Sequence, residues 1–406
     1  MKQIGGVRIP QKLINLLWHK PRALAAACMF GFPWKRLTVI GIAGTKGKTS
    51  TAYILSHILD NAGYTNALIS TAALKIAGQE SPNALKMTSP DVFFLNRFLR
   101  DAIKQGCTYA VLEVSSHAID QYRVWGIPFS LLILTNLHPD HLEYHETAEE
   151  YQSIHKRIVS SRYTTLILNG DEITTRKFRA TPKQKIFFTH DGLVAQALAK
   201  ASIPLLTSFQ KINIIAAATA AYTLSLPIET ITKSLQSLTA IPGRCEYINA
   251  GQSFKVIVDY AHSPLSLQTF FGSLRETHRG PIITVFGACG ERDEKTRAPM
   301  GTILDQFSDT IIVTNDDPYS EDPEKIAHDL MVGVTKKQNG TSLFKILDRR
   351  EAIKKAFTLA APDMVVCILG KGAEQLQVFK DTKMPWDDRS VARETLKDVL
   401  AQIQKH

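Results

Sequence analysis

Gly41-Ile-Ala-Gly-Thr-Lys-Gly-Lys-Thr-Ser-Thr51 is the stretch that decides the fold of this 406-residue chain. It follows an apolar run, Leu37–Ile40, that is typical of a buried strand, and it leads into Ala52–Leu59, whose apolar spacing predicts a helix. A Gly-rich turn between a strand and a helix presents backbone N–H groups and the positive end of the helix dipole to an anion. In such a turn Lys48 reaches the phosphates and Thr49 offers its hydroxyl to Mg²⁺. The stretch therefore predicts a phosphate-binding loop for a nucleoside triphosphate.

The loop departs from the usual GxxxxGK[ST] pattern, because Ile42 stands where the first glycine is expected. The alternative is an ordinary glycine turn before a helix, but a strand, a Lys-Thr pair and a helix in this order favour the phosphate site. The candidate nucleotide-binding residues of the loop are Gly44, Thr45, Lys46, Gly47, Lys48, Thr49 and Ser50.

Length and composition describe a globular protein of more than one domain. A chain of 406 residues exceeds one ordinary core, and 44% hydrophobic with 21% charged residues is a common composition. The net charge of +10 is spread along the chain, which suits anionic small substrates as well as nucleic acid and alone does not choose between them. The five cysteines are scattered without CxxC spacing. We therefore expect no disulfide framework, no zinc site and a reducing cytoplasmic location. The motifs of the chain, rather than its composition, favour small-molecule substrates and no nucleic-acid partner.

No apolar run reaches the roughly 18 residues of a membrane span. Residues 1–36 predict a short helical extension, with apolar positions at Ile14, Leu16, Leu17, Leu24 and Ala27. A helix that packs on the body of the protein is the simpler interpretation, and a helix for a membrane surface or a partner is the alternative.

From Leu37 onward the pattern alternates between strands and helices, which predicts an α/β fold with a mostly parallel sheet like that of P-loop ATPases. The expected strands are Leu37–Ile42, Asn66–Ser70, Tyr109–Glu113, Leu131–Thr135 and Thr165–Asn169. The expected helices are Lys48–Ala62, Val92–Gln105 and Glu149–Ser160.

A second strand–helix series follows a break near residues 241–252 and predicts a Rossmann-like domain. Its expected strands are Lys255–Asp259, Ile282–Gly287, Thr310–Thr314 and Val365–Leu369, and its expected helices are Pro264–Thr277, Pro323–Val332 and Arg350–Ala360. The predicted organisation is an extension at 1–36, a central ATP-binding domain at 37–242 and a C-terminal domain at 243–406.

Polar clusters follow several predicted strands, where ligands bind in open α/β sheets. Glu113 ends one strand and is the candidate acid for holding Mg²⁺ beside the phosphate loop. Asp140, His141 and His145 follow the next strand along the chain and can add a metal ligand, although Mg²⁺ takes imidazole only occasionally. Taken singly, each histidine is more often a surface or loop residue.

These motifs together resemble the Mur ligases over about residues 34–400, and within that family the MurE type, which adds the third peptide residue to UDP-N-acetylmuramoyl-dipeptide. The matching motifs, in chain order, are GTKGKT, TSPD from Thr88, EVSSHAIDQYRV, TNLHPDHLEYH, IPGRCE, DYAHSP, FGACGERD, NDDPYSEDP, GKGAE and DDR from Asp387. Ten ordered matches are far more specific than one GKT.

The resemblance implies an ATP-dependent amide ligase of peptidoglycan precursor synthesis, with ATP and Mg²⁺ as cofactors. ATP phosphorylates a carboxylate of the nucleotide–sugar peptide, and the amine of an incoming amino acid then displaces the phosphate. Such chemistry depends on phosphate binding, Mg²⁺ and electrostatic stabilisation more than on a protein nucleophile.

The resemblance also implies a role for each matching residue. Lys48, Glu113, His141 and Arg244 are the catalytic set, and Arg244 reaches the γ-phosphate with a fork that suits it. Asn136 joins the nucleotide ligands, Asn213 contacts the adenine and Asp259 lies by the ribose. The metal ligands are Thr49, Glu113, His141 and His155 (or Lys156). The muramoyl-peptide is held by Thr88, Ser89, Ser115, Gln121 and Arg123, and the amino acid by Arg292, Asp317, Tyr319 and Glu374.

Two departures from the family pattern concern the acceptor and the metal. Only about 36 residues precede the phosphate-loop strand, where the family has a UDP-binding domain, so the UDP is held weakly, or a protein partner supplies that grip, or the acceptor is not a UDP-sugar. The family also carbamylates a lysine four residues after a tyrosine. Counting from Tyr151 puts His155 there and Lys156 one place later, and a shift of one helical residue turns a side chain by about 100°. His155 in place of the carbamate, or an offset helix that presents Lys156, are the two possibilities.

A third departure concerns the amino acid. Diaminopimelate-adding members read Asp-Asn-Pro-Arg where this chain reads Asp316-Asp-Pro-Tyr319. Tyr319 cannot replace the arginine charge that holds the distal carboxylate, and Asp317 favours a cationic end, so lysine is a better expectation than diaminopimelate. The alternatives to a muramoyl-peptide ligase are a ligase of the same superfamily with another acceptor, such as a folate-like polyglutamate, and a non-catalytic nucleotide-binding subunit.

Overall fold

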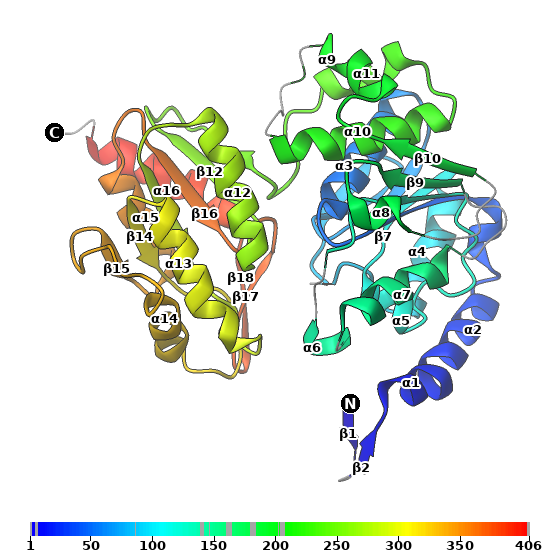
Figure 1. Ribbon diagram of the computed structural model, residues 1–406, viewed down its shortest axis with the longest axis horizontal. Helices are drawn as coiled ribbons and strands as arrows, with labels where there is room; N and C mark the ends of the chain where they lie inside the picture. The colour runs from blue at the N-terminus through cyan, green and yellow to red at the C-terminus, as the bar shows by residue number, and fades with distance from the viewer. Residues whose placement is uncertain are drawn as a thin grey trace. The chain divides into compact units, whose positions relative to one another are not determined.

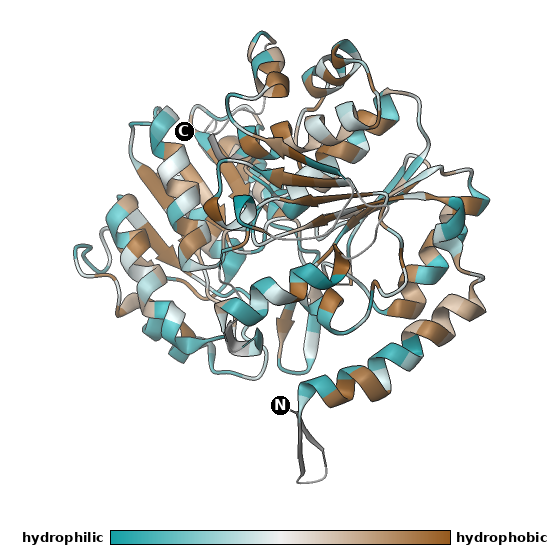
Figure 2. Cartoon of the chain, turned by 45° about the vertical axis from the view of Figure 1, so that its right-hand side comes forward, coloured by the Kyte–Doolittle hydropathy of each residue, from teal (hydrophilic) through white to brown (hydrophobic). Residues whose placement is uncertain are grey.

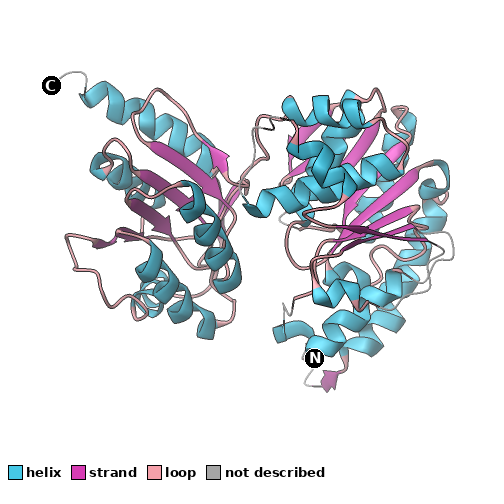
Figure 3. Ribbon diagram, turned by 45° about the horizontal axis from the view of Figure 1, so that its top comes forward, coloured by secondary structure: helices cyan, strands magenta, loops and turns pink. Residues whose placement is uncertain are grey.

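The structure is a computed structural model that describes residues 2–4, 7–85, 87–138, 142–145, 147–159, 165–178, 184–201, 203 and 208–403. The chain forms two compact units, Met1–Thr239 and Ala240–His406, and each has its own sheet (Figure 1). The expected α/β fold is confirmed, because helices cover both faces of mainly parallel sheets in both units (Figure 3).

The first unit is built on an eight-stranded sheet with the order β10-β9-β8-β3-β7-β4-β5-β6. The strands from β10 to β4 are parallel, and β5 and β6 add an antiparallel edge. Their bounds are β3 Thr38–Ala43, β4 Asn66–Ile69, β5 Ala73–Ile76, β6 Gln79–Pro82, β7 Tyr109–Glu113, β8 Leu131–Leu134, β9 Thr165–Asn169 and β10 Gln184–Phe188. The strand that precedes the phosphate loop, β3, lies between β7 and β8, so the polar residues that end these two strands meet the loop.

Helices cover both faces of this sheet. Residues 39, 43, 110, 112, 132 and 134 face α4 and α7, whereas α3 and α10 pack together on the opposite face (Figure 1). The alternation follows from the two-residue period of a strand that is buried on both sides. The helix bounds are α3 Lys48–Asn61, α4 Val92–Lys104, α5 Ser116–Asp120, α6 Leu142–His145, α7 Ala148–Ile158, α8 Ile173–Arg176, α9 Leu193–Ala199, α10 Ser208–Thr223 and α11 Ile228–Gln236.

The segment before the sheet differs from the helical extension that the sequence predicts. It starts with a two-stranded antiparallel pair, and its helices follow only from Gln11. Of the five apolar positions named for this segment, Ala27 is buried, whereas Leu16, Leu17 and Leu24 are exposed. The segment packs on the body through its alanines rather than through these leucines. The bounds are β1 Lys2–Ile4, β2 Val7–Ile9, α1 Gln11–Ile14, a π-helical turn η1 Asn15–His19, α2 Lys20–Met29 and a 3₁₀ turn η2 Pro33–Arg36.

The second unit has a six-stranded sheet with the order β11-β12-β16-β13-β14-β15, parallel except for β11. Helices α15 and α16 pack on one face through Ala352, Phe357 and Leu396. The strands are β11 Glu246–Tyr247, β12 Lys255–Asp259, β13 Ile282–Phe286, β14 Thr310–Val313, β15 Leu343–Lys345 and β16 Val365–Leu369, with a hairpin of β17 Leu376–Phe379 and β18 Thr382–Pro385. The helices are α12 Pro264–Thr277, a 3₁₀ turn η3 Glu294–Thr296, α13 Arg297–Phe307, α14 Pro323–Met331, α15 Arg349–Leu359 and α16 Asp388–Ile403.

Candidate active site

The phosphate loop can be formed only with glycine at two of its positions. Gly44 has φ +128°, and a Cβ there would lie 2.4 Å from Thr135 Oγ1. Gly47 has φ +83° just before α3, and a Cβ there would lie 2.1 Å from Asn213 Oδ1 of α10. Both contacts are far shorter than a carbon atom tolerates, so these positions explain why the loop keeps two glycines although the first consensus glycine is Ile42. The same approach places Asn213 beside the loop at Gly47, and its contact with the adenine stays a prediction.

The end of β8 holds the loop by hydrogen bonds to its backbone. Lys46 N donates to Asn136 Oδ1 at 2.8 Å, and Thr45 N donates to Asn136 O at 3.0 Å. Thr135 Oγ1 donates to Lys46 O at 2.6 Å. Asn136 therefore helps to fix the shape of the loop, and this predicted nucleotide ligand is in direct contact with the loop backbone.

Lys48, the first residue of α3, folds back over the loop. Its Nζ donates to Gly44 O and to Thr45 O, each at 2.9 Å. This geometry puts an ammonium across the mouth of the loop, at the N-terminus of a fourteen-residue helix. A helix N-terminus and an ammonium together attract a phosphate. Thr49 and Ser50 follow in the first turn and are buried.

Glu113, at the end of β7, lies against Thr49. Thr49 Oγ1 donates to Glu113 Oε1 at 3.0 Å, and Thr71 donates to the same carboxylate from its N–H at 2.6 Å and from its hydroxyl at 3.2 Å. The carboxylate is buried and acceptor-only, so it presents oxygen where the phosphate loop ends. A hydroxyl and a carboxylate in contact beside a phosphate loop are a donor set that fits Mg²⁺.

His155 adds a nitrogen donor with an unused lone pair. Its Nδ1 lies 2.9 Å from Tyr151 O, and since a carbonyl oxygen only accepts, Nδ1 carries the proton. Nε2 is buried and has no hydrogen-bond partner among the described residues. Burial lowers the pKa of His155 to about 4, so the imidazole is neutral, which is the metal-binding form.

Helix α7 separates the two alternatives for the third metal ligand. His155 is buried, whereas its neighbour Lys156 lies on the exposed side of the helix. Tyr151, one turn before His155, shares a 2.9 Å hydrogen bond between its hydroxyl and Thr45 Oγ1, which ties α7 to the phosphate loop. The geometry favours His155, and the orphaned Nε2 fits a metal site. His141 lies outside the described residues.

The residues expected to hold the acceptor form one connected network beside Glu113. Ser89 Oγ donates to Glu113 O at 2.9 Å and accepts from Ser115 N at 3.1 Å. Arg123 donates to Ser89 O at 2.6 Å and to Gln121 Oε1 at 2.6 Å. Thr88 joins through a hydroxyl contact with Thr71 at 2.9 Å. The structure thus brings all five predicted residues to the Glu113 end of β7.

Sequence reasoning missed a second layer of this network around Asp120. Its carboxylate accepts from Tyr144 OH at 2.9 Å, from Arg157 at 2.8 Å and from Asn15 Nδ2 at 2.6 Å. Tyr144 OH in turn accepts from Gln121 Nε2 at 3.3 Å, and burial raises the pKa of Tyr144 to about 12. The N-terminal segment therefore reaches the acceptor residues through Asn15, a contact that no local pattern indicates.

In the second unit, Arg244 lies in a tightly packed turn. Gly243 has φ +60°, and a Cβ there would lie 2.1 Å from Ala373 N. The Arg244 guanidinium stacks 4.5 Å from the centre of the Tyr260 ring. Asp259 is buried and accepts from Cys245 N at 2.7 Å and from Ala261 N at 2.8 Å. Burial raises the pKa of Asp259, and its described contacts hold the Arg244 turn in place.

The residues expected to hold the amino acid also lie together in this unit. Tyr260 OH donates to Glu374 Oε1 at 3.3 Å. Burial raises the pKa of Tyr260 and of Tyr319, and the positive charge of Arg292 partly opposes this rise. Burial raises the pKa of Tyr319 to about 12, so its phenol is neutral.

Asp317 is less available than the sequence suggests. Its carboxylate accepts from Lys371 Nζ at 2.9 Å and from Val378 N at 2.8 Å. The same ammonium donates to Asp316 at 3.2 Å and to Glu374 at 3.1 Å. Burial opposes the charge of Lys371, but the three carboxylates outweigh it and raise its pKa. One buried ammonium is thus shared by three carboxylates.

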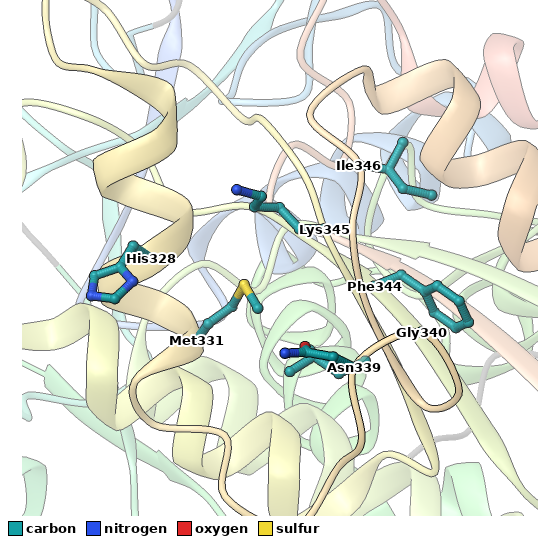
Figure 4. Close-up of a pocket in the computed structure, with 8 residues that line it drawn as sticks. His328, Met331, Asn339, Gly340, Phe344, Lys345 and Ile346 are labelled. Atoms are coloured by element: carbon teal, nitrogen blue, oxygen red, sulfur yellow. The ribbon is translucent and has the colours of Figure 1, made fainter.

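The second unit also contains a pocket outside the set of predicted site residues (Figure 4). It lies between α14 and β15, and Lys345 at its wall pairs with Glu324. None of the predicted site residues lines it. The lining residues are His328, Met331, Asn339, Gly340, Leu343, Phe344, Lys345 and Ile346.

Comparison with known proteins decides the family. Residues 42–228 match the Mur ligase middle domain, and residues 243–372 match the Mur ligase glutamate ligase domain. The chain is 33% identical to the UDP-N-acetylmuramoyl-L-alanyl-D-glutamate–2,6-diaminopimelate ligase of Thermosynechococcus vestitus. The alignment spans 403 residues and covers 93% of this chain and 80% of the relative.

The chain belongs to the Mur ligase family.

Like the members of that family, this Mur ligase is an ATP-dependent ligase that forms amide bonds. The UDP-N-acetylmuramyl-tripeptide synthetase of Roseiflexus sp. (strain RS-1) is 31% identical, over 98% of this chain and 84% of the relative. A solved diaminopimelate ligase superposes with a TM-score of 0.61 and 26% identity over 99% of this chain and 85% of that one. A folylpolyglutamate synthase of Mycobacterium tuberculosis has a TM-score of 0.69 at 16% identity, over 89% of this chain and 97% of that one, a likeness of fold alone.

Proposed function

We propose that this Mur ligase adds an amino acid to a UDP-N-acetylmuramoyl-peptide in peptidoglycan precursor synthesis. The observation that carries the proposal is the contact between two sets of residues at the end of β7. Glu113 accepts from Thr49 of the phosphate loop with its carboxylate and from Ser89 of the acceptor network with its backbone oxygen. A phosphoryl donor held by the first set and a carboxylate held by the second are adjacent in such an arrangement. Relatives with this acceptor in their names cover the chain almost entirely.

The proposed reaction has two steps. In the first, a carboxylate oxygen of the acceptor attacks the γ-phosphorus of ATP, the bond to the bridging oxygen breaks, and ADP leaves with an acyl phosphate formed. In the second, the amino acid's amine attacks the acyl carbon, the phosphate leaves, and the amine loses a proton as the amide forms. Lys48 neutralises charge on the transferring phosphoryl group, and Arg244 is proposed as a further phosphate ligand.

Mg²⁺ is proposed as the companion of ATP, with Thr49, Glu113 and His155 as the residues that hold it. When bound, it neutralises phosphate charge and orients the γ-phosphate. Thr71 keeps the Glu113 carboxylate in one orientation by donating to it twice. Tyr151 fixes the tautomer of His155 through its carbonyl, as outer partners of metal ligands commonly do. Asn213, Asn136 and Asp259 are proposed to support the nucleotide.

We propose an amino acid whose side chain ends in an amine, such as lysine or ornithine. Asp316, Asp317 and Glu374 share the ammonium of Lys371, and Glu374 is the partly exposed member. A group of carboxylates attracts an incoming ammonium. Arg292 is proposed to pair with the α-carboxylate. The distal carboxylate of diaminopimelate would meet the neutral phenol of Tyr319, which offers one hydroxyl and no charge.

The test is a product assay by mass spectrometry with ATP and Mg²⁺. The acceptors are UDP-N-acetylmuramoyl-dipeptide, UDP-N-acetylmuramate and a folate, and the amino acids are lysine, ornithine, diaminopimelate and glutamate. We expect a new amide product with the dipeptide acceptor and lysine or ornithine. Amide formation only with the folate, or ATP binding without turnover on every acceptor, contradicts the proposed function. Equal use of diaminopimelate contradicts the pocket argument alone.

A further inference from the structure

The N-terminal helices present large apolar side chains to solvent. Leu13, Leu17 and Leu24 are 46%, 66% and 46% exposed, and Trp18 is 59% exposed. Leu13 lies in α1, Leu17 in η1 and Leu24 in α2, so exposed leucines occur along the whole N-terminal segment. Hydrophobic bands follow this segment in Figure 2, at the edge of the first unit. We call Leu13, Leu16, Leu17, Trp18, Leu24 and Met29 the N-terminal apolar face.

This face is turned outward because the opposite side of the segment makes the contact with the body. Ala23 and Ala26 are buried against Val92, with Phe93 packed beside them. Asn15 is buried and donates to Asp120. Alanines allow close approach to α4, so the larger residues are left on the outside. A helix that is apolar on both sides needs a second apolar environment.

The charges around the face have one sign along the sequence. No acidic residue precedes Asp60, whereas Lys12, Lys20, Lys35 and Arg36 all lie in this segment. Lys35 and Arg36 are exposed. Besides Asp120, which accepts from Asn15, two acidic side chains from the body pair with basic residues of the segment. Glu150 lies 3.6 Å from Lys12, which is itself 89% exposed, and Asp91 pairs with Arg22. The remaining lysines and Arg36 leave the segment cationic.

We propose that the N-terminal apolar face docks in the surface of a bilayer that contains anionic lipid. Exposed leucines with a tryptophan, flanked by lysine and arginine, have the chemistry of a helix that lies in the headgroup region. A second copy of the chain fits less well, because a twofold contact would place these cationic segments against each other. The surface is a docking surface and not a span: among the helices described, none has the length and apolar character to cross a membrane.

The test is vesicle co-sedimentation of the full chain. The probes are vesicles of phosphatidylcholine alone and of phosphatidylcholine with about a third phosphatidylglycerol. The variant is Leu17→Glu/Leu24→Glu, and the control is Leu193→Glu, which makes one such substitution at a 73% exposed leucine of α9. Thermal unfolding checks that each variant is folded, and light scattering gives the mass in solution. A milder variant, Leu17→Gln/Leu24→Gln, serves if the double glutamate variant does not fold.

We expect binding to the anionic vesicles, weakened about tenfold or more by the double variant and by high salt, and unchanged by Leu193→Glu. Absence of binding to anionic vesicles overturns the proposal, and so does binding that the double variant leaves intact. Equal binding to both kinds of vesicle overturns the role of anionic lipid. A dimer that the double variant dissociates would assign the face to a second copy and also overturn the proposal.

Discussion

Replacing Lys371 with methionine removes the ammonium that three carboxylates share while keeping a side chain of similar length. The side chain of Lys371 is fully buried, and those of Asp316 and Asp317 are only 7% and 3% exposed. Glu374 is 21% exposed, so water can replace the lost bond there. The two charge-assisted hydrogen bonds to Asp316 and Asp317 are lost without replacement by water, at about 1.5–3 kcal/mol each. Breaking a buried ion pair from one side costs about 3–5 kcal/mol, and we expect a loss of that size in the free energy of unfolding of the second unit.

The assay is denaturant unfolding with hydrogen exchange followed at β16, because a chain of two units need not unfold in one step. Lys345→Met is the matched control, since Lys345 is 43% exposed and pairs with the exposed Glu324, so its loss should cost below about 1 kcal/mol. Lys371→Met/Asp317→Asn should recover part of the stability by removing one stranded charge. The amino-acid KM should rise as Glu374 loses its anchor. A loss below about 1 kcal/mol for Lys371→Met would refute the reasoning.

Three further outcomes test the first unit and the acid stability of the second. Gly47→Ala should lower ATP affinity about a hundredfold, measured by calorimetry, because its Cβ strikes Asn213 at a left-handed φ; unchanged affinity would rule out this loop geometry. His155→Ala should raise the Mg²⁺ concentration for half-maximal turnover by about tenfold and Lys156→Ala should leave it unchanged, and the reverse result would assign the ligand to Lys156. Burial opposes the charge of Asp305, but hydrogen bonds from the backbone of residues 335 and 336 outweigh it and lower its pKa. The ionised Asp305 therefore stabilises the fold at pH values above its unfolded pKa, near 4, and this stabilisation is lost as the pH falls through its lower folded pKa. Asp305→Asn should lower the free energy of unfolding by about 1–2 kcal/mol at pH 7. The same variant should flatten the fall of that free energy toward acid pH, measured by urea unfolding.

The central strands of the two large sheets could be predicted because local pattern and tertiary burial agree there. Strands β7, β9, β12 and β16 begin and end where the apolar runs predict, since a parallel strand buried on both faces is a continuous apolar run. The edge strands β5 and β6 were missed. β5 has only four residues, Ala-Leu-Lys-Ile, and β6, Gln-Glu-Ser-Pro, is polar and exposed throughout, so their pairing leaves little hydrophobic signal.

The candidate site was predictable where a residue follows a strand and not where it depends on distant packing. Glu113 is the last residue of β7 and Asn136 lies two residues after β8, so their positions come from the sheet. Thr71 and Asn15 contact the site from segments far away in sequence, and neither carries a local signal. The sequence shows the negative charge of Asp317 but not that Lys371 donates to its carboxylate.

The close contact between Gly243 and the Gly372–Ala373 backbone has a consequence for the order of events in the reaction. A Cβ at either glycine would meet the backbone of the other loop, so the Arg244 turn and the loop that carries Lys371 and Glu374 have no room to slide past each other. We therefore expect the two loops to shift together. On the roles proposed for Glu374 and Arg244, binding of the amino acid and placement of the Arg244 guanidinium would then be one kinetic event.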